Sequence, residues 1–233
     1  MTTLRFDDLV TETSQRLYGL NALIELIDQA TPGFELDERN ALEQIGKLED
    51  WGSADYDLEH QFLDIKFDWL PRMAAYSIFI LLSSIVETQL LAFARRIGRG
   101  KSPFDPNDLK GSVLDRVRVY VKKVSDLDLS QNEHWQHLKD LQDLRDIIVH
   151  RAGKPRWDDM KQRQHVEQMR KYPGVSLDRN RHTLESDVEL NFTVHSCKYF
   201  AAKVEDFFKN IFKDAGMPTR IGLWPNIQSG FVR

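Results

Sequence analysis

The fold of this chain is decided by residues 73–97, which read MAAYSIFILLSSIVETQLLAFARRI. The uncharged part, from Met73 to Val86, is shorter than the roughly 20 apolar residues that a membrane-spanning helix needs. Polar and charged side chains interrupt the remainder of the run. We therefore expect a buried helix in the centre of a globular protein, with no membrane as a partner.

Helical spacing of apolar residues continues over most of the remaining chain. Helices are expected over residues 6–30, 36–51, 56–70, 108–124, 131–149, 157–172 and 192–212. Pro32-Gly33 should end the first of these, and Pro71 should break or kink the chain before the apolar helix. Alternation in Val175–Leu177 and Val188–Leu190 predicts a short hairpin or extended loop. The expected fold class is all-α, a helical bundle with one small extended or hairpin insertion and extra N-terminal helices.

Three parts are expected along the chain: an acidic N-terminal helical extension over 1–70, a bundle core over 71–213, and an irregular tail over 214–233. Hydrophobic residues make up 41% of the chain, which excludes an intrinsically disordered protein. Cys197 is the only cysteine, so the chain has no internal disulfide, and a cytoplasmic location is expected.

The net charge is only −4, but acidic and basic residues are concentrated in different segments of the chain. Residues 1–70 hold 5 Lys and Arg against 16 Asp and Glu. The balance reverses to 9 against 3 over residues 95–123 and to 9 against 4 over residues 151–181. Such basic segments are typical either of an ordinary solvated surface or of a face that binds anions.

Between the two basic segments lies LRDIIVHRAG, residues 144–153. Arg145 and His150 stand among apolar residues at what reads as the end of a helix. One interpretation is structural: His150 faces the negative end of the helix dipole, and Gly153 supplies a left-handed stop. The other is chemical, since a guanidinium can hold a phosphate while an imidazole moves protons, which is enough to cut RNA without a metal.

Helix geometry constrains the chemical interpretation. Five residues of regular helix place Arg145 and His150 about 140° apart around the axis. Asp146 and His150 are one turn apart, so the carboxylate could orient the imidazole. A compact site therefore requires either local unwinding near His150 or a second copy of the chain that supplies the partner residue.

The segment around Arg145, Asp146 and His150, placed before a polar insertion and an aromatic helix, resembles the motif of the HEPN superfamily (higher eukaryotes and prokaryotes nucleotide-binding). In that family an Arg, a polar residue, a few apolar residues and a His lie near the end of the third core helix. The Ser83-Ser84-x-x-Glu87 notch in the long apolar helix is also similar to a HEPN core helix. The resemblance covers roughly residues 70–213.

The resemblance implies a metal-independent endoribonuclease without a cofactor, which acts as a homodimer and is often the toxin of a toxin–antitoxin or phage-defence system. RNA would be cut by attack of the 2′-OH. His150 would be the general base or acid, Arg145 would neutralise the phosphate, and Asp146 would orient His150 or bond the substrate. Glu87 and Ser84 would support Arg145. A subgroup that an antitoxin modifies has a Tyr two residues after the His, where this chain has Ala152.

Two alternatives remain open. The chain could be a non-catalytic HEPN-fold module for protein interaction or nucleotide binding, with the acidic N-terminal helices binding a basic partner. Those helices could also mimic nucleic acid and cover the basic face of a subunit.

Other candidate side chains favour structural roles. His134 and His137 are expected at the surface, and His195 and Cys197 face different directions. His165 and His182 are expected either to contact phosphate or to be solvated. The aromatic residues over 199–212 are expected in the core or at a dimer interface.

Overall fold

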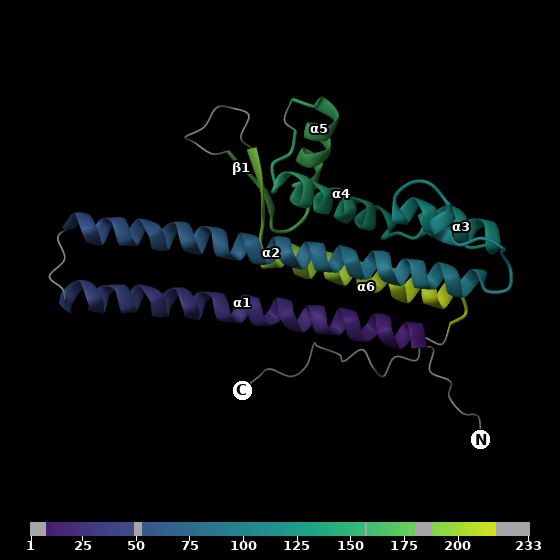
Figure 1. Cartoon of the computed structure of the whole chain (residues 1–233), viewed down its shortest axis with the longest axis horizontal. Coiled ribbons are helices and arrows are strands. Elements are labelled where there is room, and N and C mark those ends of the chain that lie inside the picture. The colour runs from purple at the N-terminus through teal and green to yellow at the C-terminus, as the bar shows by residue number, and fades with distance from the viewer. Residues whose placement is uncertain (1–7, 49–52, 157, 180–187, 218–233) are drawn as a thin grey trace, which may run out of the picture. The chain divides into compact units, whose positions relative to one another are not determined.

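The computed structural model describes residues 8–48, 53–156, 158–179 and 188–217 (Figure 1). Its α-helices are α1 (Asp8–Leu48), α2 (Ser53–Gly98), α3 (Val113–Val124), α4 (Trp135–Arg151), α5 (Met160–Met169) and α6 (Val194–Asp214). Two short 3₁₀ turns, Pro106–Asp108 and Leu129–Gln131, join the middle helices. Strands β1 (Val175–Arg179) and β2 (Val188–Phe192) form the one sheet of the described residues. The prediction of an all-α helical bundle with a small insertion is confirmed.

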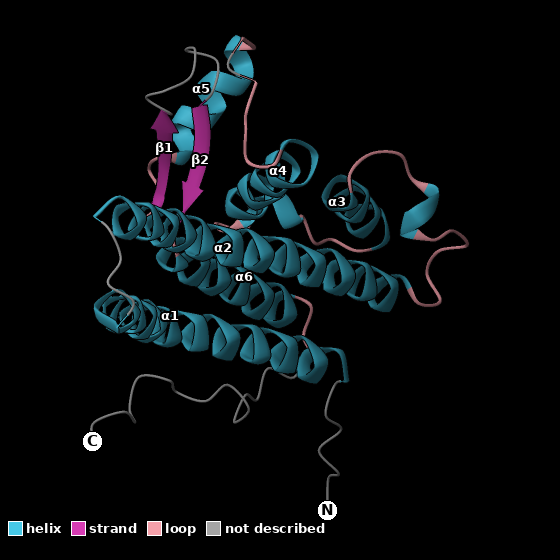
Figure 2. Ribbon diagram, turned by 60° about the vertical axis from the view of Figure 1, so that its left-hand side comes forward, coloured by secondary structure: helices cyan, strands magenta, loops and turns pink. Residues whose placement is uncertain are grey.

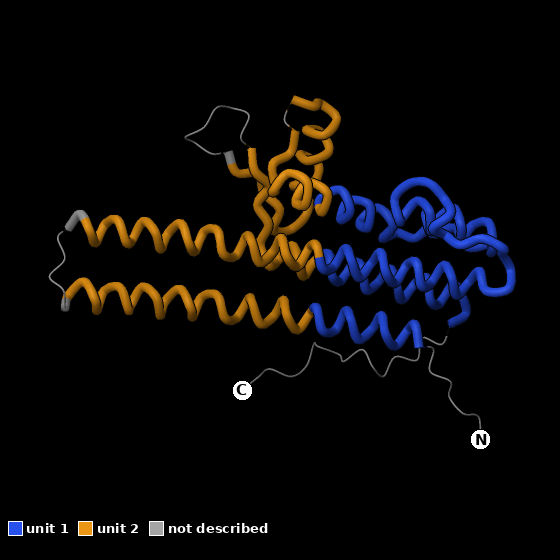
Figure 3. The backbone as a smooth tube through the Cα atoms, viewed as in Figure 1, with its two compact units in different colours: residues 1–20, 81–144, 200–233 blue, residues 21–80, 145–199 orange. Residues whose placement is uncertain are grey.

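The chain divides into two compact units (Figure 3). Unit 1 comprises residues 1–20, 81–144 and 200–233, and unit 2 comprises residues 21–80 and 145–199. The helices α1, α2, α4 and α6 each contribute one part to each unit. The predicted boundary at residue 70 falls inside α2, which continues without interruption to Gly98. The predicted tail over 214–233 lies outside the described residues from position 218 onward.

Unit 1 is held together by an aromatic core. The ring centroid of Phe212 on α6 lies 5.9 Å from that of Phe93 on α2, and Phe207 lies 6.0 Å from Trp135 on α4. All four side chains are buried, so the aromatic stripe predicted on α6 belongs to the core. Between α1 and α2, the buried hydroxyl of Thr13 donates to the Gln89 side chain over 2.8 Å.

Unit 2 contains the hairpin. Strands β1 and β2 pair antiparallel, with Val175 opposite Phe192 and Leu177 opposite Leu190, as the alternating segments predicted (Figure 2). Arg72 on α2 ties the two strands to the helix. Its guanidinium donates to Glu189 on β2 over 2.9 Å and to Asp178 on β1 over 2.7 Å.

The expected helix stop at Pro32-Gly33 is wrong, because α1 runs through it. The expected break at Pro71 does not occur, because α2 is continuous there. A kink at Pro71, the other expectation, stays a prediction. A proline inside a helix removes one backbone hydrogen bond, a loss that tertiary packing can offset. In unit 2, α1 and α2 pack along each other: the rings of Phe34 and Phe67 lie 5.7 Å apart, and Arg39 pairs with Asp64 at 2.8 Å. The helix pair therefore extends past both prolines.

Part of α2 is long and apolar enough to cross a membrane by length and composition alone. In the structure 56% of that apolar window is buried within the protein. Its most deeply buried side chains, Phe79, Leu82 and Leu90, have no exposed surface. The apolar part of α2 is thus buried in the protein, as expected for a core helix.

Candidate active site at the end of α4

The last two turns of α4 carry the three residues of the predicted motif. Leu144, Ile147 and Ile148 are buried and hold this part of the helix in the protein. Arg145 is half-buried beside them, and His150 is exposed in the final turn. The apolar residues thus anchor the helix while the motif side chains reach solvent.

The end of α4 is sharply defined at Gly153. Ala152 and Gly153 have φ angles of 50° and 84°, and the Gly153 amide donates to the carbonyl of Ile147 over 3.2 Å. A Cβ at Gly153 would overlap the hydroxyl oxygen of Tyr76 on α2. The predicted left-handed stop is confirmed, and it is a position where only glycine fits both the backbone and the space.

Strand β2 completes this helix end. The amide of Leu190 donates to the carbonyl of Gly153 over 2.9 Å, and the Tyr76 hydroxyl donates to the carbonyl of Leu190 over 2.5 Å. Burial raises the pKa of Tyr76 above its ordinary value, so the phenol stays a hydrogen-bond donor at neutral pH. Sequence reasoning missed Tyr76, because a tyrosine in an apolar helix gives no signal of this contact.

Arg145 pairs with its neighbour. Its Nη1 donates to Oδ1 of Asp146 over 2.7 Å, with 29% and 45% of the two side chains exposed. The expected contact between Asp146 and His150 is absent from the described residues, because the carboxylate turns toward the guanidinium. The His150 imidazole makes no hydrogen bond or ion pair with any described residue.

Helix α4 stays regular through His150 and ends at Arg151. Local unwinding, one of the two routes to a compact site, therefore does not occur in this structure. Arg145 and His150 remain about 140° apart around the axis, and no bond joins them within the described residues. One chain by itself does not assemble the pair, which leaves the partner copy as the remaining route.

The two residues expected to support Arg145 lie on α2. Ser84 is exposed and Glu87 is half-buried. Neither side chain forms a hydrogen bond or ion pair with a described residue. Both belong to unit 1 whereas Arg145 belongs to unit 2, so their supporting role stays a prediction.

Among the other histidines, His134 differs from expectation. It is 8% exposed rather than at the surface, because it lies at the start of α4 beside the buried Trp135. His195 is exposed while Cys197 is buried, with its Sγ 3.7 Å from the carbonyl oxygen of Ala75, so the two form no nucleophile pair. His182 lies outside the described residues.

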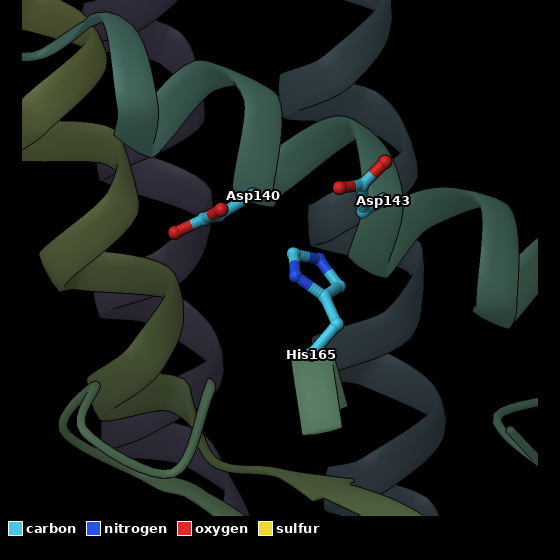
Figure 4. A group of neighbouring side chains, drawn as sticks. All are labelled: Asp140, Asp143 and His165. Carbon is cyan, nitrogen blue, oxygen red and sulfur yellow. The ribbon is translucent and has the colours of Figure 1, made fainter. Parts of the chain in front are cut away.

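Figure 4 shows Asp140 and Asp143 on α4 and His165 on α5. Asp140 is buried and accepts a hydrogen bond from Gln136 over 2.8 Å, whereas Asp143 is exposed. These two carboxylates belong to unit 1, and His165 belongs to unit 2. Two carboxylates alone do not define a metal site. The expectation that the chain needs no metal stays a prediction.

Comparison of the chain with models of protein families, with curated proteins and with solved structures finds no match. The case for a function therefore depends on the residues at the end of α4.

Proposed function

We propose that the chain is a metal-independent endoribonuclease of HEPN type that works as a homodimer, with Arg145 and His150 as its catalytic residues. The observation that carries the proposal is the placement of His150: an exposed imidazole without a partner among the described residues, on a helix end that Gly153 and β2 hold in place. A general base must reach its substrate and must not be engaged by the protein.

In the proposed reaction the neutral His150 imidazole removes the proton from a ribose 2′-OH. The 2′-oxygen attacks the adjacent phosphorus, and the bond from phosphorus to the 5′-oxygen breaks. That oxygen takes a proton from water, and the His150 imidazolium returns its proton to the solvent. The products are a 2′,3′-cyclic phosphate and a 5′-OH end, and no oxidant, metal or cofactor is needed.

Arg145 is suited to hold the phosphate during this reaction. Only its Nη1 is engaged, by Asp146, so the Nε and Nη2 groups keep donors for the phosphate oxygens. The pair with Asp146 also keeps the guanidinium in one orientation. Because Arg145 and His150 diverge on one helix, each His150 would act with the Arg145 of the other copy across a two-fold groove.

The test is RNA cleavage by the purified protein in EDTA. We expect His150→Ala to lower the rate at least 100-fold, within the range of about 10²–10⁴ for loss of a general acid–base group. His195→Ala, which removes an exposed histidine of the same unit, should leave the rate unchanged. Equal cleavage by the wild type and by His150→Ala would exclude the proposed catalytic role.

A mixture of Arg145→Ala and His150→Ala subunits tests the shared groove. Half of the randomly mixed dimers contain one intact pairing, so activity should return to about a quarter of the wild-type value. If each variant alone is inactive and the mixture stays inactive, the shared groove is wrong.

As a toxin of a defence or toxin–antitoxin system, the wild type should also arrest growth when it is expressed alone. The alternative function, a non-catalytic interaction or nucleotide-binding module, is favoured by one observation. Asp146 already neutralises Arg145 within the same chain. Under that alternative His150→Ala and the wild type behave alike in both assays.

A further inference from the structure

The N-terminal half of α2 carries an apolar stripe that the chain leaves exposed. Its five side chains are each about half exposed: Leu58 50%, Phe62 55%, Ile65 56%, Trp69 45% and Met73 40%. Steps of three and four residues put all five on one side of the helix, within an arc of about 80°. A contiguous exposed row of large apolar side chains marks an interaction surface.

Helix α1 does not cover this stripe, because it packs on the opposite side of α2. Phe67 is 8% exposed and its ring lies 5.7 Å from that of Phe34 on α1. On α2, Phe67 lies roughly 160° from the centre of the stripe. Nearer the start of α2, the ring of Tyr56 packs against Gly46. The outer face of the helix pair is therefore not covered by the described part of α1.

The edges of the stripe are acidic. Asp55, Asp57 and Glu59 are exposed and make no ion pair with any described residue. The cation at this edge, Lys66, is 3.1 Å from Glu38 on α1 and is thus already paired. An apolar face with unpaired carboxylates beside it fits a partner that has the opposite charges.

The ring of Trp69 packs against a side chain that is itself fixed in place. The guanidinium carbon of Arg72 lies 5.5 Å from the centroid of its ring. Arg72 is itself fixed by Asp178 and Glu189, and its side chain is only 6% exposed. A half-exposed tryptophan on a fixed support loses little freedom on binding, which is the usual character of an interface hot spot.

We propose that this stripe is the docking site for an amphipathic helix of a partner protein whose apolar face is flanked by Lys or Arg. A helix-in-groove or helix-on-helix contact matches the three- and four-residue spacing of the stripe. From Leu58 to Met73 the stripe covers about 23 Å of helix, so about four turns of a partner helix would cover it.

Charge distinguishes this partner from the other possible occupants. The part of α2 that a second, antiparallel copy would lay on the stripe brings no unpaired cation to Asp55, Asp57 and Glu59, since its Arg72 and Lys66 are already engaged. An anionic lipid surface would be repelled by the same carboxylates. A basic helix satisfies both the apolar row and the acidic edge, and the inference stands independently of RNA cleavage.

The test measures binding of two synthetic helical peptides of about 18 residues by fluorescence anisotropy. Both have the same leucine face, with lysines on its flanks in one and glutamates in the other. The lysine peptide should bind the full chain at least ten times more tightly. Ile65→Asp should weaken this binding at least tenfold, whereas Leu36→Asp, at a 60% exposed site on α1, should leave it within twofold.

Charge reversal supplies a second, independent variant. The triple change Asp55→Lys, Asp57→Lys and Glu59→Lys should reverse the preference toward the glutamate peptide. The control triple on α1, Glu25→Lys, Asp37→Lys and Glu43→Lys, should keep the preference for the lysine peptide. All the replaced side chains reach solvent, so circular dichroism should show unchanged folding.

The proposal is overturned if the two peptides bind equally, or if Ile65→Asp leaves the binding unchanged. Sedimentation that shows a dimer broken by Ile65→Asp and kept by Leu36→Asp would assign the stripe to a second copy instead. Flotation with phosphatidylserine vesicles that depends on Ile65 would assign it to a membrane. None of these readouts uses RNA, so the failure of either proposal is distinguishable from the failure of the other.

Discussion

Replacing Gly153 by alanine tests how the end of α4 is built. The backbone at Gly153 has a φ of 84°, which costs an L-residue about 1–2 kcal/mol. The new Cβ would overlap the hydroxyl oxygen of Tyr76 and lie 2.8 Å from its Cζ, an overpacking worth about 1–3 kcal/mol. Gly153→Ala should therefore lower the free energy of unfolding by about 2–5 kcal/mol, the sum of the backbone and packing costs.

Urea unfolding followed by circular dichroism measures this loss. Gly100→Ala is the matched control, because Gly100 also has a positive φ, 74°, but an added Cβ there would meet no atom within 4 Å. It should lose only the backbone part, about 1–2 kcal/mol. Adding Tyr76→Phe to Gly153→Ala removes the closest clashing atom, so the double variant should be at least about 1 kcal/mol more stable than the sum of the single losses predicts. Equal losses for Gly153→Ala and Gly100→Ala would refute the packing argument.

Two further predictions concern buried groups of unit 2. Arg72→Ala leaves Asp178 and Glu189 without their cation and should lower the free energy of unfolding in urea by about 3–5 kcal/mol. The control Arg163→Ala breaks an exposed pair with Glu167 and should lower it by at most about 1 kcal/mol. Equal losses for the two variants would contradict the anchoring role of Arg72. Burial raises the pKa of Cys197 to about 12, above the value of about 8.5 for an unfolded thiol. The buried neutral thiol therefore contributes fully to the free energy of unfolding below about pH 8.5, and this contribution is lost as the pH rises toward 12. Urea unfolding of Cys197→Ala between pH 8 and 11 should show a shallower decline than the wild type, and parallel declines would contradict this.

The elements of the fold were largely predictable because periodicity reports burial directly. The alternating Val175–Leu177 and Val188–Leu190 segments form the two strands, and the aromatic row of α6 lies in the core. The continuation of the helices through Pro32 and Pro71 was not predictable in the same way. Sequence rules for proline consider only the local loss of one backbone hydrogen bond. The packing of Phe34 against Phe67, which offsets that loss, joins residues far apart in sequence and cannot be inferred locally.

The candidate site was predictable only at the level of residue type and helix position. Periodicity placed His150 in the last turn and Gly153 at the stop, as observed. It also placed Asp146 one turn from His150, but spacing does not determine which neighbour a carboxylate prefers, and Arg145 is the stronger donor. The contact of Tyr76 with the helix end depends on tertiary structure alone.

The central claim is tested most directly by the ends of the RNA that the protein produces in EDTA. Attack by the 2′-OH at a site that depends on His150 predicts fragments with a 2′,3′-cyclic phosphate and a 5′-OH, and no cleavage at a position where the ribose is replaced by 2′-deoxyribose. These fragments should be missing from the His150→Ala reaction. Fragments with a 3′-OH and a 5′-phosphate, or continued cleavage at the 2′-deoxy position, would contradict the account.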